Sequence, residues 1–135
     1  MKLLVIGRGL ASLAAATVIA AACMPSSDAI TDRPWSLSEI NGAAPAVPGR
    51  IEFAADGTYT TQPGCNTGGG AYSIRANTIS IEPGPMTAMA CGEPADSQEQ
   101  AFLAVLGAEP RFEIETGSGR LRLTDATGAL VFVTP

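Results

Sequence analysis

The chain contains no histidine, and its one lysine is Lys2. Without histidine, neither the Ser-His and Cys-His pairs that activate a nucleophile nor a histidine-ligated zinc site can form. Without a further lysine, Schiff-base chemistry and a Ser-Lys pair have no amine beyond the N-terminal segment. The composition therefore excludes the commonest nucleophilic and zinc-dependent enzymes, and we expect no metal and no cofactor.

Basic residues are scarce along the whole chain. After residue 22 there are six arginines against 13 acidic residues. Nucleic acids and anionic lipid surfaces both attract proteins through clusters of Lys and Arg. We therefore expect no nucleic-acid partner, and any association with a membrane must come from attached acyl chains.

The apolar run at the N-terminus, residues 9–22, is too short to span a bilayer, which takes about 20 residues. Because it follows Lys2 and ends in an Ala-x-Ala pattern, it predicts an export signal over residues 1–22. The next residue is then Cys23, the position that carries the acyl chains in a bacterial lipoprotein. Ordinary secretion with a free Cys23 is the alternative.

The segment after this cysteine, residues 23–33, is small and polar and shows no hydrophobic period. It predicts a tether between the lipid and the folded part of the chain. The remaining residues, 34–135, suffice for one hydrophobic core, so we expect a single domain there.

Short stretches of alternating apolar and polar residues, separated by turns with Gly, Asn or Asp, follow one another through this domain. They predict a mainly β (α+β) fold, a small antiparallel sheet or barrel of about seven to eight short strands. No clear strand continues from Thr60 towards Gly64. The predicted strands include residues 50–54, 58–60, 71–74, 78–81, 111–115, 120–124 and 129–133.

One strand register can be predicted from charge. If residues 116–119 form a four-residue loop, Glu115 faces Arg120 and Glu113 faces Arg122. Such opposite-charge pairs contribute only about 0.2–1 kcal/mol each, so they adjust the register while burial of the other face drives the pairing. The residues of that buried face are then Phe112, Ile114, Leu121 and Leu123.

One helix is predicted between Asp96 and Gly107. Asp96 can cap its start, and Glu99 three residues later fits a capping box. Glycine suits the C-terminal stop. The apolar face that covers the sheet comprises Phe102, Val105 and Leu106.

Cys65 and Cys91 are the two cysteines within the predicted domain. In an exported chain they most simply form a disulfide, which closes a loop of about 26 residues and contributes on the order of 3 kcal/mol. A redox-active pair is less favoured, because neither cysteine lies in a Cys-x-x-Cys motif at a helix start.

The motifs around these cysteines carry a resemblance to a known family. The chain resembles the META-domain family of HslJ-like proteins over nearly all of the predicted domain, and it is similar to the exported lipoprotein members. The resemblance implies a small antiparallel β domain with one helix, associated with the cell envelope and stress, without established catalytic residues or a cofactor. Its residues are Trp35, Gly64, Cys65, Asn66, Tyr72, Thr87, Met89, Cys91, Leu121, Leu123, Leu130 and Phe132.

The glycine run, residues 68–70, invites comparison with a phosphate loop. That loop requires a Lys and the N-terminus of a following helix, and both are missing here. A turn or a bulge at a close approach of two backbones is favoured instead. Asn66 is expected to hold this turn together through its side chain.

Two carboxylates on one strand face, Glu113 and Glu115, leave a carboxylate-dependent hydrolase formally open. Glycosidases place such a pair in a cleft with divergent environments, whereas glutamates that face arginines indicate a solvated sheet surface. Residues 125–128 predict a turn, with too few oxygen ligands for a calcium loop.

The leading hypothesis is a non-catalytic envelope lipoprotein with a binding or structural role in envelope stress and an unknown envelope protein partner. Acyl chains on Cys23 would anchor it to the bacterial envelope. Because Met24, and not Asp, follows Cys23, resemblance to known sorting behaviour implies the periplasmic face of the outer membrane. The alternative is a small inhibitor of a protease or wall hydrolase, with a binding loop at residues 83–86 or 64–70.

Overall fold

The computed structural model describes residues 15–19 and 26–135. Most of the predicted export signal, and the predicted lipidation site Cys23, lie outside the described residues. Residues 15–19 are exposed and form neither helix nor strand. In the part of the chain that the structure describes, no helix has the length and hydropathy needed to cross a membrane.

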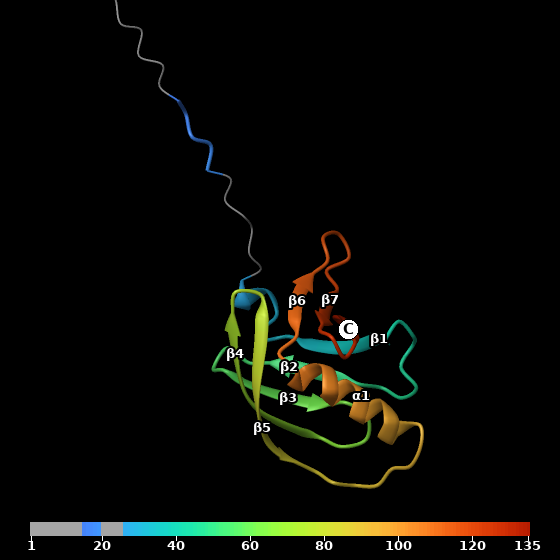
Figure 1. The fold of residues 1–135 in the computed structure, drawn as a ribbon. Coiled ribbons are helices and arrows are strands. Elements are labelled where there is room, and N and C mark those ends of the chain that lie inside the picture. The colour runs from blue at the N-terminus through green and yellow to red at the C-terminus, as the bar shows by residue number, and fades with distance from the viewer. Residues whose placement is uncertain (1–14, 20–25) are drawn as a thin grey trace, which may run out of the picture.

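Eight antiparallel strands form a closed barrel in which each strand pairs with the next along the chain, and β8 returns to pair with β1 (Figure 1). This confirms the predicted fold class. A short 3₁₀ helix, η1 (Ser27–Ala29), precedes the barrel, and the single α-helix of the described residues lies between β5 and β6. The elements are β1 (Pro34–Ile40), β2 (Arg50–Phe53), β3 (Thr58–Gln62), β4 (Gly68–Arg75), β5 (Thr78–Met86), α1 (Ala95–Gly107), β6 (Arg111–Ile114), β7 (Leu121–Thr124) and β8 (Ala129–Val133).

Side chains fill the interior of the barrel. The largest is Trp35, whose indole N–H donates to the carbonyl oxygen of Ile30 at 2.9 Å. Helix α1 contributes to the same core, where Phe102 packs edge to face against Phe132 with 5.8 Å between the ring centres. The other large, fully buried side chains are Phe53, Phe112, Ile51, Ile79, Leu106, Leu121, Leu123 and Leu130.

Helix α1 completes the barrel where its sheet is weakest. Strands β5 and β6 share one paired position, Thr78 with Arg111, whereas the neighbouring pairs share four or more. The predicted apolar face of the helix, with Phe102, Val105 and Leu106, is buried in the core. The helix therefore covers the interior where the β5–β6 ladder is short.

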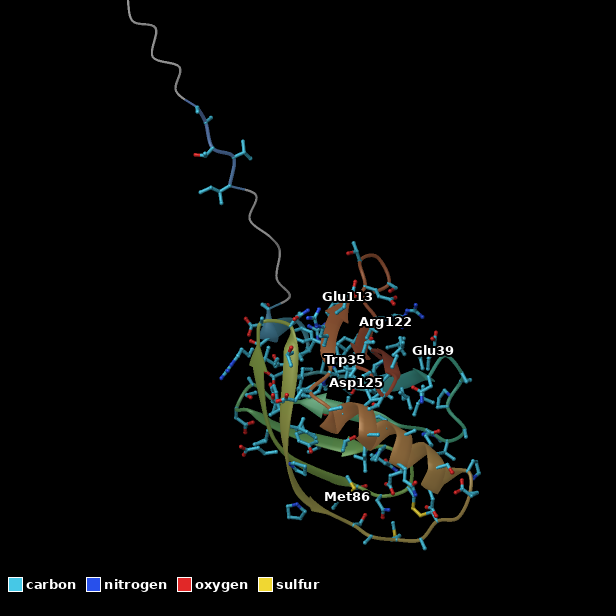
Figure 2. The ribbon with its side chains drawn as sticks, viewed as in Figure 1. Trp35, Glu39, Met86, Glu113, Arg122 and Asp125 are labelled. Atoms are coloured by element: carbon cyan, nitrogen blue, oxygen red, sulfur yellow. A yellow bond between two sulfur atoms is a disulfide. The ribbon has the colours of Figure 1, made fainter. Side chains whose placement is uncertain are left out.

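The predicted register of β6 and β7 is confirmed. Glu113 lies opposite Arg122, and Ile114 lies opposite Leu121. Figure 2 shows Glu113, Arg122 and Glu39 on the outer surface of this side of the barrel. The alternation of charged and apolar residues thus fixed both the register and the inward face.

The packed part of the chain begins earlier than predicted. Ile30 is fully buried, and Asp32 donates its backbone N–H to the carbonyl of Phe53 at 2.8 Å. Residues 27–33 therefore lie against the barrel and are not part of a free tether. A single isoleucine among polar residues has no periodicity, which is why the pattern did not predict its burial.

Two segments considered as turns or binding loops lie partly or wholly in strands. Residues 68–70 begin β4 and residues 83–86 end β5, so the suggested inhibitor loop at 83–86 is a strand, and only residues 64–67 of the one at 64–70 remain a loop. A methyl group on Gly69 would collide with the carbonyl oxygen of Tyr59 on β3. The glycines are therefore needed for close backbone approach, and a register shift between Gly68 and Gly70 marks the predicted bulge.

The strand registers place the loops at two opposite ends of the barrel. The hairpin end comprises the turns at 54–57 and 76–77, the loop at 115–120, and the entering chain, residues 26–33. The junction end comprises the loops at 41–49, 63–67 and 87–94. In Figure 1 the first residues of the described domain, 26–33, lie at the hairpin end, away from the loop that joins β5 to α1.

Candidate functional site

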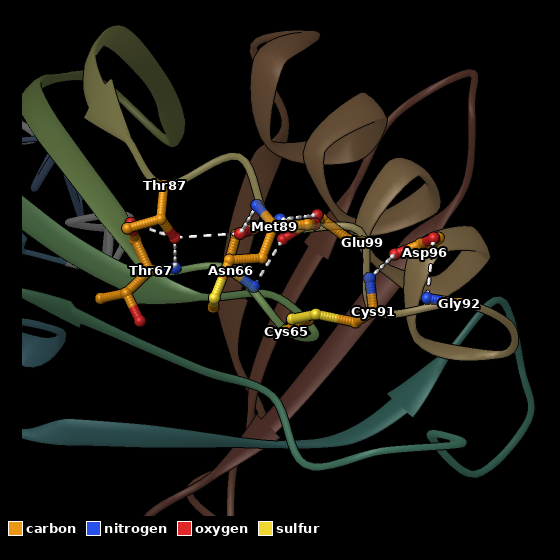
Figure 3. The surroundings of a disulfide bond; sticks show 9 residues. All are labelled: Cys65, Asn66, Thr67, Thr87, Met89, Cys91, Gly92, Asp96 and Glu99. Atoms are coloured by element: carbon orange, nitrogen blue, oxygen red, sulfur yellow. Dashed lines mark hydrogen bonds between the residues drawn. A yellow bond between two sulfur atoms is a disulfide. The ribbon is translucent and has the colours of Figure 1, made fainter.

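The motif residues that surround the two cysteines meet at the junction end. The loop before β4, the loop after β5 and the first turn of α1 contact one another there (Figure 3). The other motif residues lie elsewhere, Tyr72 within β4 and the rest in the barrel core: Trp35, Leu121, Leu123, Leu130 and Phe132. We call this cluster the loop–helix junction, and its residues are Cys65, Asn66, Thr87, Met89, Cys91, Asp96, Gln98 and Glu99.

A disulfide between Cys65 and Cys91 links the two loops, as predicted. The Cα atoms are 6.2 Å apart, and 26 residues separate the cysteines along the chain. Cys65 precedes β4 and Cys91 follows β5, so the bond closes the open end of the long β4–β5 hairpin. It therefore holds together the part of the sheet that lies farthest from the hairpin's own turn.

The Asn66 side chain connects all three segments of the junction. Its Oδ1 accepts from the Met89 N–H at 2.7 Å and from the Thr87 hydroxyl at 3.0 Å. Its Nδ2 donates to the Met89 carbonyl at 3.1 Å and to a Glu99 carboxylate oxygen at 2.8 Å. Asn66 is 5% exposed and uses its full side-chain hydrogen-bonding capacity. The role predicted for it, tying a loop together, holds, and it extends to a second loop and a helix.

Glu99 does not complete the capping box that the sequence predicted. Its carboxylate accepts from the backbone N–H of Asn66 at 3.0 Å as well as from the Asn66 side chain. Asp96 lies inside the first helical turn, after the start at Ala95, and accepts from the N–H groups of Cys91 at 3.3 Å and Gly92 at 3.1 Å. Both acids satisfy backbone groups of the loops, since tertiary contacts compete with local capping.

Gln98 is a junction residue that sequence reasoning missed. Its Oε1 accepts from the Val47 N–H at 3.0 Å, and its Nε2 donates to the carbonyls of Val47 at 2.8 Å and Pro63 at 3.0 Å. The side chain is buried, with 6% of the residue exposed. A polar residue between Asp96 and Glu99 looked like part of a solvated helix surface, and nothing local in the sequence distinguished it.

Gly64 allows the helix to lie close to the loop. A Cβ atom there would lie 2.8 Å from the carbonyl oxygen of Ala95. Glycine at this position therefore brings the first turn of α1 into hydrogen-bonding distance of Asn66. This gives the Gly-Cys-Asn motif a physical explanation in which each residue makes a separate connection.

Met89 is the one large apolar side chain that is strongly exposed within residues 26–135, at 57%. Its backbone is held on both sides, because its N–H and its C=O both bind Asn66. The neighbouring residues Ala88 and Ala90 are also exposed. The junction thus fixes the backbone of a loop whose apolar side chain is in solvent.

Glu113 and Glu115 lie on the outer surface of β6 and the following loop, where Glu113 faces Arg122 across the strands. Glu115 bonds the guanidinium groups of Arg120 at 2.7 Å and Arg122 at 2.9 Å, and these bonds lower its pKa from 4.5 to about 2. Arg120 also reaches Glu39 at 3.3 Å. A carboxylate ionised this firmly cannot supply the proton of a general acid near neutral pH.

The described surface offers small, shallow depressions. Four of them, of about 170 to 370 Å³, are lined mainly by strand residues, and none of the four is lined by a residue of the loop–helix junction. Within residues 15–19 and 26–135, no three His, Cys, Asp or Glu side chains are grouped to hold a metal ion. Residues 125–128 form the predicted turn, in which Asp125 donates its N–H to the Gly128 carbonyl at 3.0 Å.

Comparison with known proteins gives a family and a fold. The META domain model matches residues 28–135. No curated protein matches the chain. An NMR structure of another protein is similar with a TM-score of 0.70 and 17% identity, covering 82% of this chain and 96% of that one. A second NMR structure, of a protein from Burkholderia xenovorans, gives a TM-score of 0.62 and 22% identity, covering 96% and 99%.

Proposed function

Because the chain belongs to the META domain family, we propose that it is an exported lipoprotein of the bacterial cell envelope that acts by binding and not by catalysis. Its acyl chains would be carried on Cys23, on the periplasmic face of the outer membrane. The binding role would serve the envelope under stress. The disulfide carries this proposal.

The disulfide supports export because such bonds persist in oxidising compartments and are rare in the cytosol. Cys65 and Cys91 are bonded at the surface of the domain, where Cys91 is exposed. Reductants in the cytosol could reach and reduce a bond at this position, so its presence is consistent with the oxidising periplasm. The signal-like segment that ends at Cys23 supports the same location from an independent part of the sequence.

A binding role is supported by the chemistry of the junction. Asn66 has all its hydrogen bonds made within the protein, and Glu99 and Asp96 accept from backbone N–H groups. These side chains fix conformation and hold no proton or nucleophile ready for transfer. The chain as a whole has no histidine.

The inhibitor alternative gains little support from the segments first considered for it, because residues 83–86 and the last part of 64–70 are strands. Residues 64–67 remain a loop, in which Cys65 is bonded to Cys91 and the Asn66 side chain is buried in contacts with Met89 and Glu99. A substrate-like loop must offer free backbone N–H and C=O groups to the enzyme. At the exposed Met89 both groups are bound to Asn66. Insertion into a protease cleft in the manner of a substrate is therefore disfavoured.

Metabolic labelling with a fatty-acid analogue tests the anchor. In bacteria that express the full chain, the wild type should take up label and fractionate with membranes. The variant Cys23→Ser should be unlabelled and soluble in the periplasm. Equal labelling of the two proteins would refute the lipid anchor.

A deletion strain tests the stress role. Loss of the gene should reduce survival under envelope stress, such as detergent or heat, and the wild-type chain should restore it. The Cys23→Ser variant should restore survival poorly, because the protein would no longer be held at the membrane. Unchanged survival of the deletion strain across such stresses would contradict the role.

A further inference from the structure

The loop that carries Met89 is held far more firmly than an ordinary surface loop. Both backbone polar groups of Met89 bind Asn66, and Cys91, two residues on, is bonded to Cys65. The N–H groups of Cys91 and Gly92 bind Asp96. Loops of this length usually move, and a loop fixed in one conformation loses little entropy when a partner binds.

The chain segment around Met89 carries no charged side chain. Residues 83–92 contain no charged residue, and Pro83, Pro85, Ala88 and Ala90 in this segment are exposed. Met89 is the largest exposed apolar side chain among them, at 57%. Methionine suits such a position because its flexible, polarisable side chain adapts to an apolar pocket.

Acidic residues border this apolar segment on both sides. Glu82 precedes it and Glu93 follows it, and both are exposed. From residue 76 to residue 110 the chain has no basic residue, and the other acids there are Asp96, Glu99 and Glu109. An apolar centre with a charged rim is the usual composition of a protein–protein interface.

The surface also lies on the accessible side of an anchored domain. The N-terminal chain enters at the hairpin end, and residues 27–33 pack on the barrel there, while the loop with Met89 lies at the junction end (Figure 1). An anchor at Cys23 would therefore hold the hairpin end near the bilayer. The Met89 surface would then point away from the lipid, towards soluble or wall-bound proteins.

We propose that the Met89 surface, comprising residues 83–93, docks a partner protein that offers an apolar pocket bordered by Lys and Arg. The acidic border repels anionic lipid and a second copy of this acidic chain, and it attracts a basic rim. Met89 is the anchor that enters the pocket, and the junction holds it in place. This inference rests on the proposed envelope role and names the site and the partner chemistry for it.

Site-specific photocrosslinking in intact cells tests the proposal. A benzophenone amino acid replaces Met89 in the full-length chain, and a matched control carries it at Thr116, an exposed position at the hairpin end. The Met89 position should give one discrete protein adduct that the Thr116 position does not. The cross-linked peptide of the partner should contain Lys or Arg beside apolar residues.

Competition by untagged protein shows whether the adduct forms through the Met89 surface. An untagged wild-type copy should suppress the adduct, and an untagged Met89→Asp copy should compete about 30-fold less well, as expected for loss of an interface anchor. The charge change leaves the Asn66 contacts with the backbone intact, so the variant should keep the wild-type melting temperature. A Cys65→Ser/Cys91→Ser copy, with the loop released, should also compete poorly.

Each other result overturns the proposal. The docking proposal is refuted if Met89 and Thr116 give equal adducts, or if no adduct forms. It is also refuted if the adduct is with lipid, with a second copy of this chain or with an acidic peptide. Fatty-acid labelling of the same samples distinguishes failure of the docking proposal from failure of the proposed lipid anchor. Labelled protein without the expected adduct refutes the surface alone, whereas unlabelled wild-type protein refutes the lipid anchor.

Discussion

At the scale of single residues, the buried Asn66 side chain makes four hydrogen bonds that join two loops and a helix. One amide group satisfies the backbone of Met89, the hydroxyl of Thr87 and the carboxylate of Glu99. Removing one partner from a buried hydrogen bond leaves the other without a substitute, which costs about 1–3 kcal/mol for each such group. The effects of substitution at Asn66 should therefore be large and specific to the atom that is changed.

Asn66→Asp should destabilise the domain by about 2–5 kcal/mol at neutral pH, because it removes a buried donor and places an oxygen beside Glu99. Two carboxylates at that distance share a proton, so the folded variant binds a proton more readily than the unfolded chain. Its stability should therefore rise as the pH falls towards 4. Urea unfolding across this pH range measures the effect.

Asn77→Asp is the matched control, because Asn77 lies in the β4–β5 turn and its side chain makes no hydrogen bond within the described residues. It should change stability by less than about 0.5 kcal/mol. A loss of stability at Asn66→Asp that is the same at pH 4 and pH 7 would show that the second carboxylate is not the cause.

Glu115 should govern part of the acid response of the barrel. Its folded pKa of about 2 lies below its ordinary value of 4.5, so its ion pairs stabilise the fold above pH 4.5 and lose that effect as the pH falls through 2. In Glu115→Gln this dependence should vanish, and the unfolding curves of variant and wild type should converge in strong acid. The NMR titration of the Glu115 side-chain carboxyl should show a midpoint near 2.

At the scale of elements, α1 both contributes to the core and holds two loops in place. One side buries Phe102, Val105 and Leu106, while Gln98 and Glu99 bind the loops at its start. The helix should therefore stabilise loops that are remote in the sequence. Variants in its first turns should loosen these loops before they disturb the barrel.

Gln98→Ala should lower the free energy of unfolding by about 1–3 kcal/mol, because the Val47 N–H and the Val47 and Pro63 carbonyls lose their buried partner. Amide exchange at Val47 should rise more than exchange in the core strands. Gln100→Ala, in the same helix at an exposed position, should change stability by less than about 0.5 kcal/mol. Similar losses of unfolding free energy in the two variants would contradict a specific role of the Gln98 side chain in holding the loops.

Periodicity predicted the elements whose burial is regular. The alternation around Phe112 and Leu121 gave strands and register, and the spacing of Phe102 and Leu106 gave the buried helix face. It failed where a contact is made between segments distant in sequence. The strand at residues 83–86 was not predicted because of its prolines and glycine. The partners of Gln98, Val47 and Pro63, could not be predicted because they lie on two loops that meet the helix only in the folded chain.

At the scale of the whole molecule, the disulfide should be a stabilising bond that the fold can survive without. Reduction, or Cys65→Ser/Cys91→Ser, should cost on the order of 3 kcal/mol, since the bond closes a 26-residue loop. The barrel core should persist, because its aromatic packing lies elsewhere. Thermal melting with and without reductant, followed by near-ultraviolet circular dichroism, measures both the shift and the retention of packing.

Amide exchange locates the change that reduction produces. Protection should fall in residues 87–92 and remain in β7 and β8, which form part of the core. Serine variants that melt like the oxidised wild type would show that the hydrogen bonds of Asn66 suffice to hold the loops. Complete loss of the near-ultraviolet signal would instead show that the barrel depends on the bond.

The closure of the barrel has a consequence for how the chain folds. Seven of its strand pairings join neighbours in the sequence, but β1 and β8 must meet across nearly the whole domain, as Ser38 and Val131 do over 93 residues. Closing this contact has the greatest entropy cost in the fold. The β1–β8 pairing should therefore form last, after the other strand pairs. Until then the meander is an open sheet with two unpaired edges, and such edges promote aggregation if the open state persists.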